Sequence, residues 1–531
     1  MKKRIIALIM AVFTLFTLAG CTATGGGSSD ESEKLSQESN VEESIVVEIP
    51  DDTDVVLSID KEDGNDAVFG VGCEVDPHFF SQNVGLTGRK EDGSTWECKA
   101  EDWDIVEQRM TDMNLKRIRM MLLPSWFIID ETNTEDGVYN WNSNEMQSVY
   151  KLLDTAKNLG IKICITMWGI DTGTAGYMRQ SGEVQWVTYP SEEHEKAFVD
   201  CFADCVKYLI EEKGYTNISE VTLFNEPNAL YSYPTYSKGS DDYCNLCIKM
   251  HDSFTDKGIR DSVLFTLSDD ARDYTWMARA LMNLEGVIDV ACSHTYDFGE
   301  SYNEETGLGN NDMSNNDICY NNANYNLENW RMYFADYDIP HIWGEFGTQN
   351  GIDSHKTLDK FSPTRGLDIP RISLNFFNMG SVGMSYWVLF SQYYNRGEYN
   401  QGKIMDMGLW GFADEDYNCR PVYYSYSMIT RFIEEGDIIF KIKSEDENIV
   451  AVAFRQGDKW TYAVVNNSNV DKKVSFVNYN NYPSSLSRYV YEEANVPTNN
   501  QLIDSDLTVT AQDRVLTDTV KARSFVIYTN K

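Results

Sequence analysis

The sequence predicts an α/β fold, a (β/α)₈ TIM barrel followed by a small antiparallel β-sandwich. Three observations support this prediction. From about residue 66, short apolar runs alternate with longer stretches whose apolar residues recur with helical spacing. Eight such repeats follow one another, as a closed barrel requires. From Asp437 onward the pattern changes to short runs of alternating apolar and polar residues between turn signals.

The eight barrel strands are expected to be near-continuously apolar, because parallel strands are buried on both faces. Helical segments should lie between the strands, and no Gly-x-Gly-x-x-Gly sequence supports the alternative of a doubly wound sheet. The expected strands are Val68–Cys73, Arg117–Leu122, Ile161–Met167, Val221–Phe224, Ser262–Leu267, Ile288–His294, Pro340–Glu345 and Val382–Leu389, and the expected helices are Trp103–Met110, Met146–Leu159, Glu193–Ile210, Tyr243–Phe254 and Tyr423–Ile433.

The predicted barrel occupies residues 61–436 and the predicted sandwich residues 437–531, with Gly436 ending the last barrel helix. Two further strand-like runs precede the barrel within residues 45–60, and we expect them to join the sandwich. The strands expected in the sandwich are Ile438–Ile442, Ile449–Arg455, Trp460–Asn466, Lys473–Val477, Ser487–Tyr491, Leu507–Val509 and Ser524–Thr529, and the two earlier runs are Ile45–Ile49 and Val55–Ile59.

The N-terminus is predicted to carry an export signal rather than a part of the fold. Basic residues precede an apolar run over residues 5–18, which is too short for a comfortable membrane span. The following Leu18-Ala19-Gly20-Cys21 resembles a bacterial lipobox, in which the cysteine carries the lipid. Residues 1–21 are therefore predicted to be a lipoprotein signal peptide, and residues 22–44 a flexible acidic linker. The alternative is an ordinary signal peptide. We expect a protein anchored by lipid at the extracellular face of the bacterial cell membrane.

The charge of the chain restricts its partners. The chain of 531 residues has 45 Lys and Arg against 83 Asp and Glu, a formal net charge of −38. This charge disfavours nucleic acid and favours neutral partners such as sugars. No cofactor and no metal site is predicted, and a monomer is expected. Cys164 and Cys292 fall in expected strands, where a cysteine behaves as a small buried hydrophobe.

Two glutamates end expected barrel strands. Strand 4 leads into Asn225-Glu226-Pro227, and strand 7 ends in Gly344-Glu345. Because catalytic residues of such barrels lie at the carboxyl ends of the strands, both side chains should face one mouth of the barrel. A pair of carboxyl groups, one acid and one nucleophile or base, is what cleavage of a glycosidic bond requires.

With this pattern the chain resembles the clan of retaining (β/α)₈ glycoside hydrolases that carry catalytic glutamates on strands 4 and 7. It is most similar to family 5, and the barrel-plus-sandwich layout also resembles families 30 and 39. The resemblance implies that Glu226 is the acid/base and Glu345 the nucleophile. Strand 3 departs from family 5, because Met167-Trp168-Gly169 lacks the His-Asn-like pair common there.

The resemblance also implies a set of substrate-binding residues. Asn225 would bind the sugar 2-hydroxyl, and Arg119 would lie beside the nucleophile, although it could instead pair with Asp104 or Glu107 outside the barrel. His294 and Tyr296 would line the site and orient the nucleophile. The tryptophans expected to contact sugar are Trp387 on strand 8 and, in strand-end loops, Trp168 and Trp126.

The expected function is hydrolysis of β-glycosidic bonds in polysaccharides or oligosaccharides by double displacement. A transglycosylase would differ only in the acceptor of the glycosyl group. A non-catalytic surface glycan-binding lipoprotein is the alternative from another class, and it has no need of both glutamates.

Overall fold

The computed structural model divides the chain into two units, Met1–Val46 and Val47–Lys531. The first unit, with Cys21 and the predicted linker, lies outside the described residues, and all that follows concerns the second. Among the residues that the structure describes, no helix combines the length and apolar character needed to cross a membrane. The described residues are 47–60, 64–77, 100–128, 138–171, 187–228, 239–271, 273–296, 301–303, 308–310, 337–348, 360–393, 404–405, 407–411 and 415–531.

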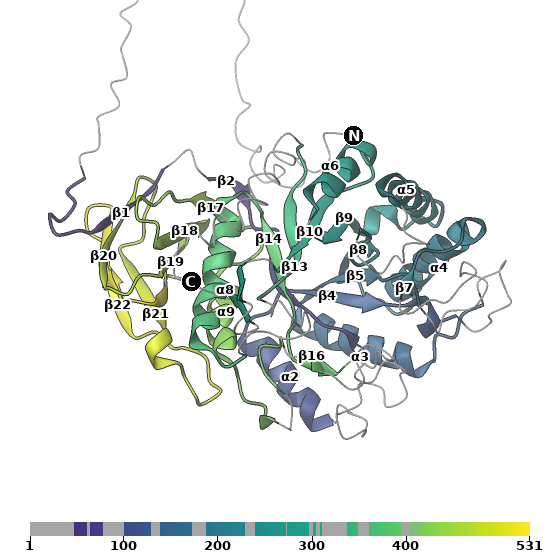
Figure 1. Ribbon diagram of the computed structural model, residues 1–531, viewed down its shortest axis with the longest axis horizontal. Coiled ribbons are helices and arrows are strands. Elements are labelled where there is room, and N and C mark those ends of the chain that lie inside the picture. Colours follow the sequence, from purple (N-terminus) through teal and green to yellow (C-terminus); the bar gives the residue numbers. More distant parts are fainter. Residues whose placement is uncertain are drawn as a thin grey trace, which may run out of the picture. The chain divides into compact units, whose positions relative to one another are not determined.

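Eight parallel strands form a closed barrel, which confirms the predicted fold (Figure 1). Strands such as β4 and β13 are buried along their whole length, as their apolar sequences predict. All eight coincide with the runs expected from the sequence, within a few residues at each end. They are β3 (Gly70–Glu74), β4 (Arg117–Leu122), β5 (Lys162–Met167), β8 (Ile218–Leu223), β9 (Leu264–Ala271), β10 (Val290–Thr295), β13 (His341–Phe346) and β14 (Gly383–Tyr386).

Amphipathic helices alternate with these strands. In α3, Ser143 accepts a hydrogen bond from the Met146 N–H at the first turn, and Gly160 ends the helix with a φ of 68°. The α-helices of the described residues are α2 (Ala100–Asp112), α3 (Asn144–Leu159), α4 (Glu195–Lys207), α5 (Ser240–Asp256), α6 (Tyr274–Asn283), α8 (Pro363–Asn378) and α9 (Pro421–Phe432). Short turns of other helix types are η3 (Pro124–Trp126), η5 (Glu192–His194), η6 (Tyr208–Glu212), η7 (Arg260–Ser262) and η9 (Glu493–Asn495).

The C-terminal residues form two facing sheets. The larger has the order β2-β17-β18-β19-β24-β21-β22, and the smaller has the order β1-β20-β23. Their strands are β1 (Val55–Ile59), β2 (Gly64–Ala67), β17 (Ile438–Lys441), β18 (Ile449–Gln456), β19 (Lys459–Asn466), β20 (Lys472–Asn478), β21 (Ser485–Glu492), β22 (Leu507–Thr510), β23 (Val515–Val520) and β24 (Ser524–Thr529). Separate two-stranded pairs are β6 (Ile170–Asp171) with β7 (Val187–Thr188), β11 (Ser301–Asn303) with β12 (Leu308–Asn310), and β15 (Gln392–Tyr393) with β16 (Ile404–Met405).

The N-terminal strands extend these sheets. β1 pairs in parallel with β20, and β2 pairs antiparallel with β17. Residues 47–49, the described part of one strand-like run, form no strand, whereas Gly64–Ala67 belong to the sandwich although they fall in the range predicted for the barrel. The polar sequence of β2, Gly-Asn-Asp-Ala, explains why its strand character was not evident.

The larger sheet has two apolar faces, and one of them packs on the barrel's helices. Along β18, Val450, Val452 and Phe454 belong to the hydrophobic core of the barrel, whereas the alternating Ala451 and Ala453 belong to the core between the two sheets. The ring of Phe454 lies 5.0 Å from that of Phe377 on α8. The barrel and the larger sheet therefore share one core.

Candidate active site

The two predicted catalytic glutamates lie together at the carboxyl end of the barrel. Glu226 follows β8 and Glu345 lies in β13, and one carboxylate oxygen of each lies within 4.8 Å of the other. The side chain of Glu226 is 17% exposed and that of Glu345 is 6% exposed. Both carboxyl groups are thus largely withdrawn from water, and the separation suits a pair acting on one bond.

The backbone that carries Glu226 is held in an uncommon conformation. Phe224 and Glu226 have φ values of 64° and 51°, in the left-handed region that non-glycine residues rarely adopt. The N–H of Glu226 donates to the main-chain carbonyl of Asp269 at 3.0 Å, and Asp269 itself has a φ of 56°. Neighbouring strand ends thus fix each other's backbone beside the site.

Glu345 receives two hydrogen bonds on its carboxylate. Arg119 donates from Nη1 to Oε1 at 2.8 Å, and the hydroxyl of Tyr296 donates to Oε2 at 2.7 Å. Burial, together with the charge of Glu345, raises the pKa of Tyr296 well above its usual value, so the phenol keeps the proton that it donates. These two donors orient both oxygens of Glu345.

Arg119 points into the barrel and connects several strands. Besides Glu345, its guanidinium donates to Asn225 Oδ1 at 2.7 Å, to Asp269 Oδ2 at 2.6 Å, and to Glu74. The alternative pairing with residues outside the barrel is therefore wrong. Burial, reinforced by the charge of Glu345, raises the pKa of Glu74 well above its usual value despite the opposing Arg119.

His294 lies between Glu226 and Asp269. Its Nδ1 is 3.1 Å from Glu226 Oε1 and 3.7 Å from Glu345 Oε2, and its Nε2 is 3.0 Å from Asp269 Oδ1. Burial alone would disfavour the charged ring, but the carboxylates of Glu345 and Asp269 outweigh it and raise the pKa of His294 well above its usual value. The carboxyl groups around His294 therefore favour the charged form of its ring.

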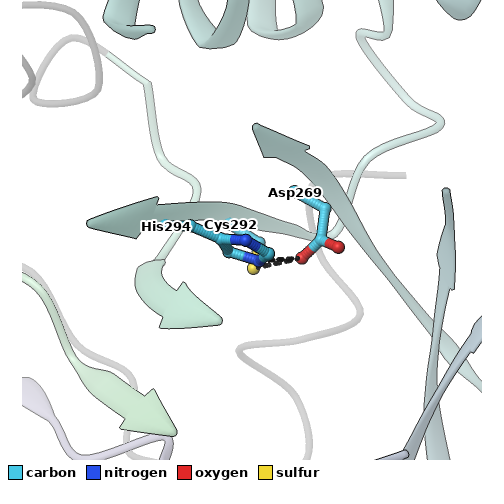
Figure 2. Close-up of side chains that lie close together, drawn as sticks. All are labelled: Asp269, Cys292 and His294. Atoms are coloured by element: carbon cyan, nitrogen blue, oxygen red, sulfur yellow. Dashed lines mark hydrogen bonds and ion pairs between the residues drawn. The ribbon is translucent and has the colours of Figure 1, made fainter. Parts of the chain in front are cut away.

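Asp269, Cys292 and His294 form a compact cluster (Figure 2). The thiol of Cys292 donates to Asp269 Oδ1 at 3.1 Å, the same oxygen that His294 faces. Burial raises the pKa of Cys292 to about 12, so the thiol keeps this proton. The expectation that Cys292 is only a small hydrophobe is therefore incomplete.

Gly344 leaves the space that the cluster needs. A Cβ at this position would lie 2.4 Å from Cys292 Sγ and 3.0 Å from both Asp269 Oδ1 and His294 Nε2. β10 also shifts register against β9 and against β13 at residues 292–294, an irregularity common beside active sites. A side chain at position 344 would therefore clash with the cluster, which explains why a glycine precedes Glu345.

Two buried residues of this network, Glu74 and Asp269, were missed from the sequence. Both stand at the carboxyl ends of barrel strands, in Glu74-Val75-Asp76 and Ser268-Asp269-Asp270. The one signal in the sequence is that these acidic residues end strands 1 and 5, as Glu226 and Glu345 end strands 4 and 7.

The predicted tryptophans are all buried. Trp387 follows β14, Trp168 follows β5 and Trp126 lies in η3 after β4, and each is less than 5% exposed. All three stand after the carboxyl ends of barrel strands and belong to the hydrophobic core of the barrel. Their predicted contact with sugar stays a prediction.

In the part of the chain that the structure describes, two groups of side chains have the composition of metal ligands, namely Asp269, Cys292 and His294, and Glu226, His294 and Glu345. Both share the cationic His294, and Arg119 pairs with Asp269 and Glu345. An additional cation would be repelled by these charges, and the hydrogen bonds already described occupy the same atoms. The chemistry of these atoms therefore fits a hydrogen-bonded network better than a metal site.

Searches by sequence profile find no matching protein family, and no curated protein matches the chain. Solved structures do match. A GH30 endoxylanase from Clostridium papyrosolvens has a TM-score of 0.59 at 11% identity, covering 90% of this chain and 99% of that one. The catalytic domain of GH30 xylanase C from Talaromyces cellulolyticus has a TM-score of 0.62 at 14% identity, covering 89% and 99%. A GH39 enzyme from Xanthomonas axonopodis has a TM-score of 0.55 at 13% identity, covering 89% and 96%.

These matches include families 30 and 39, which the layout of the sequence resembles, and they extend over both the barrel and the sandwich. The resemblance is thus confirmed for the fold.

Proposed function

We propose that this protein is a retaining glycoside hydrolase that cleaves β-glycosidic bonds of polysaccharides or oligosaccharides. The observation that carries the proposal is the approach of Glu226 and Glu345 to within 4.8 Å between carboxylate oxygens. Retaining enzymes hold their two carboxyl groups about 5–5.5 Å apart, whereas inverting enzymes need about 6.5–9.5 Å to admit a water molecule. The structural matches among xylanases and a xylosidase agree with this class of reaction.

In the first step, Glu345 attacks the anomeric carbon while Glu226 gives its proton to the leaving oxygen. The C–O bond to the leaving group breaks, and an ester between the sugar and Glu345 forms. Arg119 and Tyr296 hold the attacking carboxylate by its two oxygens, which fixes its direction of approach.

In the second step, Glu226, now ionised, takes a proton from water, and the resulting hydroxide equivalent displaces Glu345 from the sugar. Two inversions give net retention. His294, hydrogen-bonded to Glu226, holds this carboxyl group in place in both steps. A sugar hydroxyl in place of water would make the same reaction a transglycosylation.

We further propose that the protein works outside the cell, attached to the membrane by a lipid on Cys21. The sequence of the first residues supports this placement. A tethered hydrolase would release short sugars next to the cell surface.

The test is a screen for release of reducing sugar from β-glucans, mannans, xylans and galactans, followed by NMR of the first product formed. We expect one of these glycans to be cleaved with a β-configured product. An α-configured first product would overturn the retaining mechanism. Binding of a glycan without cleavage of any member of the panel would favour the non-catalytic alternative.

A further inference from the structure

We propose that Asp269, at the end of β9, is a positioning residue that couples the nucleophile to the acid/base. Its two carboxylate oxygens contact two different cations. Oδ2 accepts from Arg119 Nη2 at 2.6 Å, and Oδ1 lies 3.0 Å from His294 Nε2. This inference rests on the proposed function, because it assigns Asp269 a task in that reaction.

Each of the two cations touches a different catalytic glutamate. Arg119 donates to Glu345 at 2.8 Å, and His294 Nδ1 lies 3.1 Å from Glu226. One buried carboxylate therefore orients both groups that orient the catalytic pair. A rotation of the Asp269 side chain would displace both at once.

The main chain of Asp269 provides a third link. Its carbonyl accepts the N–H of Glu226 at 3.0 Å, at a point where both residues have positive φ values. Asp269 thus holds the acid/base by its backbone and, through His294, by its side chain.

The charges around His294 favour its doubly protonated ring. Carboxyl groups face it from the segment after β8, from β9 and from β13. The titratable groups around the ring are Glu226, Asp269, Glu345 and Cys292, with Arg119, Glu74 and Asp270 farther away. Because Nε2–H of the His294 ring is hydrogen-bonded to Asp269, Nδ1–H is the group that faces Glu226.

The contacts with Arg119 and His294 also hold the carboxylate of Asp269 in its ionised form. Burial on its own would raise the pKa of Asp269, but Arg119 and His294 outweigh this effect and hold the pKa below its ordinary value. Asp269 is therefore a fixed negative charge, fully buried, between two positive ones.

The experiment compares Asp269→Asn with the matched control Asp270→Asn. Asp270 is the next residue on β9 and equally buried, but its carboxyl group contacts Ser268, Ser293 and the N–H of Asp273 instead of the two cations. Both variants remove one buried carboxyl group, and only the first removes the coupling.

The first measurement is NMR of the His294 ring nitrogens in the wild-type protein, assigned among the six histidines by comparison with His294→Asn. We expect both nitrogens to carry protons at pH 8, and the ring to lose one in Asp269→Asn at the same pH. A neutral ring in the wild-type protein would overturn the proposal without need of any variant.

The second measurement is kcat/KM against pH, on an activated and an unactivated aryl β-glycoside. For Asp269→Asn we expect a loss of about 100-fold or more on both substrates, since buried partners that orient catalytic groups contribute from about 10-fold to about 10⁴-fold. The limbs of its pH profile should also move, because His294 loses its proton more easily. Asp270→Asn should keep the wild-type kcat/KM on both substrates.

A uniform loss in Asp269→Asn, with the pH limbs unmoved, would indicate a structural role and refute the coupling, as would activity within threefold of wild type. If Asp269→Asn does not fold, the ring NMR of the wild-type protein decides alone. Failure of the wild-type protein to cleave any glycoside would instead refute the proposed function, while the NMR would still report the state of His294.

Discussion

Replacing each catalytic glutamate by alanine should separate their two roles. Glu226→Ala removes the proton donor, so it should slow cleavage of natural glycans and leave a dinitrophenyl glycoside, which needs no protonation, far less affected. Glu345→Ala removes the nucleophile and should abolish the turnover of both substrates. The comparison tests the assignment directly, because the two side chains lie at the same barrel mouth and differ only in their partners.

The size of the first effect follows from general acid catalysis, which contributes about 10²- to 10⁴-fold. This range corresponds to about 3–5 kcal/mol in the activation free energy for a poor leaving group. The Glu226 side chain is 17% exposed, and its carboxylate lies within 4.8 Å of that of Glu345, so azide has access to the vacated space next to the anomeric carbon. Azide should therefore restore the activity of Glu226→Ala and give the β-glycosyl azide.

The same anion should act from the opposite face in Glu345→Ala and give the α-glycosyl azide. Glu435→Ala is a suitable control, since this residue makes an exposed pair with Lys162, and such pairs contribute little. The assays are initial rates on both substrates and NMR of the azide products. Wild-type rates in both alanine variants, or the same azide anomer from both, would refute the assignment of roles.

Three further predictions concern other parts of the chain. Cys21→Ala should move the protein from the membrane fraction to the medium without changing its turnover, and continued retention would contradict the lipobox interpretation. Truncation after Gly436 should give insoluble or rapidly digested protein, because Phe377 and the rest of the shared core would no longer be covered by β18. A soluble and fully active truncated protein would show instead that the sandwich is an independent module. In Asp270→Asn, urea unfolding should show a stability gain over wild type that grows from pH 4 to 7 and then levels. Burial raises the pKa of Asp270 to about 7, so in this range the carboxyl group ionises in the unfolded wild-type chain while the folded protein keeps it protonated, and the wild-type protein loses stability. The full change from 3.8 corresponds to roughly 4 kcal/mol, and a gain independent of pH would contradict this reasoning.

The barrel could be predicted because its strands leave a strong signal in the sequence. A run such as Ile342-Trp343 in β13, or Met120-Met121-Leu122 in β4, is buried on both faces and therefore apolar at every position. β2 lacks such a signal, since its four residues include Asn65 and Asp66 and its pairing with β17 depends on the tertiary fold. The sequence therefore predicts a strand where both faces are buried. It does not reveal β2, which is a strand only because it pairs with β17.

The position of the two glutamates, Glu226 and Glu345, could be predicted for a different reason. Each stands in a short polar motif that interrupts an apolar run where a strand ends, and the topology then brings the two together. The partners Glu74 and Asp269 stand at equivalent places, but their motifs are not distinctive. Their role became evident only from the four hydrogen bonds that converge on Arg119.

The period of two in β4 explains why a buried strand carries two arginines. Arg117 and Arg119 are two residues apart, so both point to the same face, the interior of the barrel. Arg117 meets Glu220 of β8 with two hydrogen bonds of 2.7 and 2.8 Å, and Arg119 meets the site network one layer closer to the carboxyl ends. The barrel interior thus contains two charged layers, one structural and one at the site.

The buried charges of the layer around Arg119 also constrain the positions of the side chains in the site. Removing one partner of a buried ion pair commonly destabilises a protein by about 3–5 kcal/mol, because the remaining charge stays buried without its partner. Arg119, Asp269 and His294 come from three strands, β4, β9 and β10, and each has partners in at least one of the others. Moving Glu226 away from Glu345 would therefore require several buried charges to lose their partners at once. The free-energy cost of that loss is the physical reason why the two glutamates are held at a fixed separation.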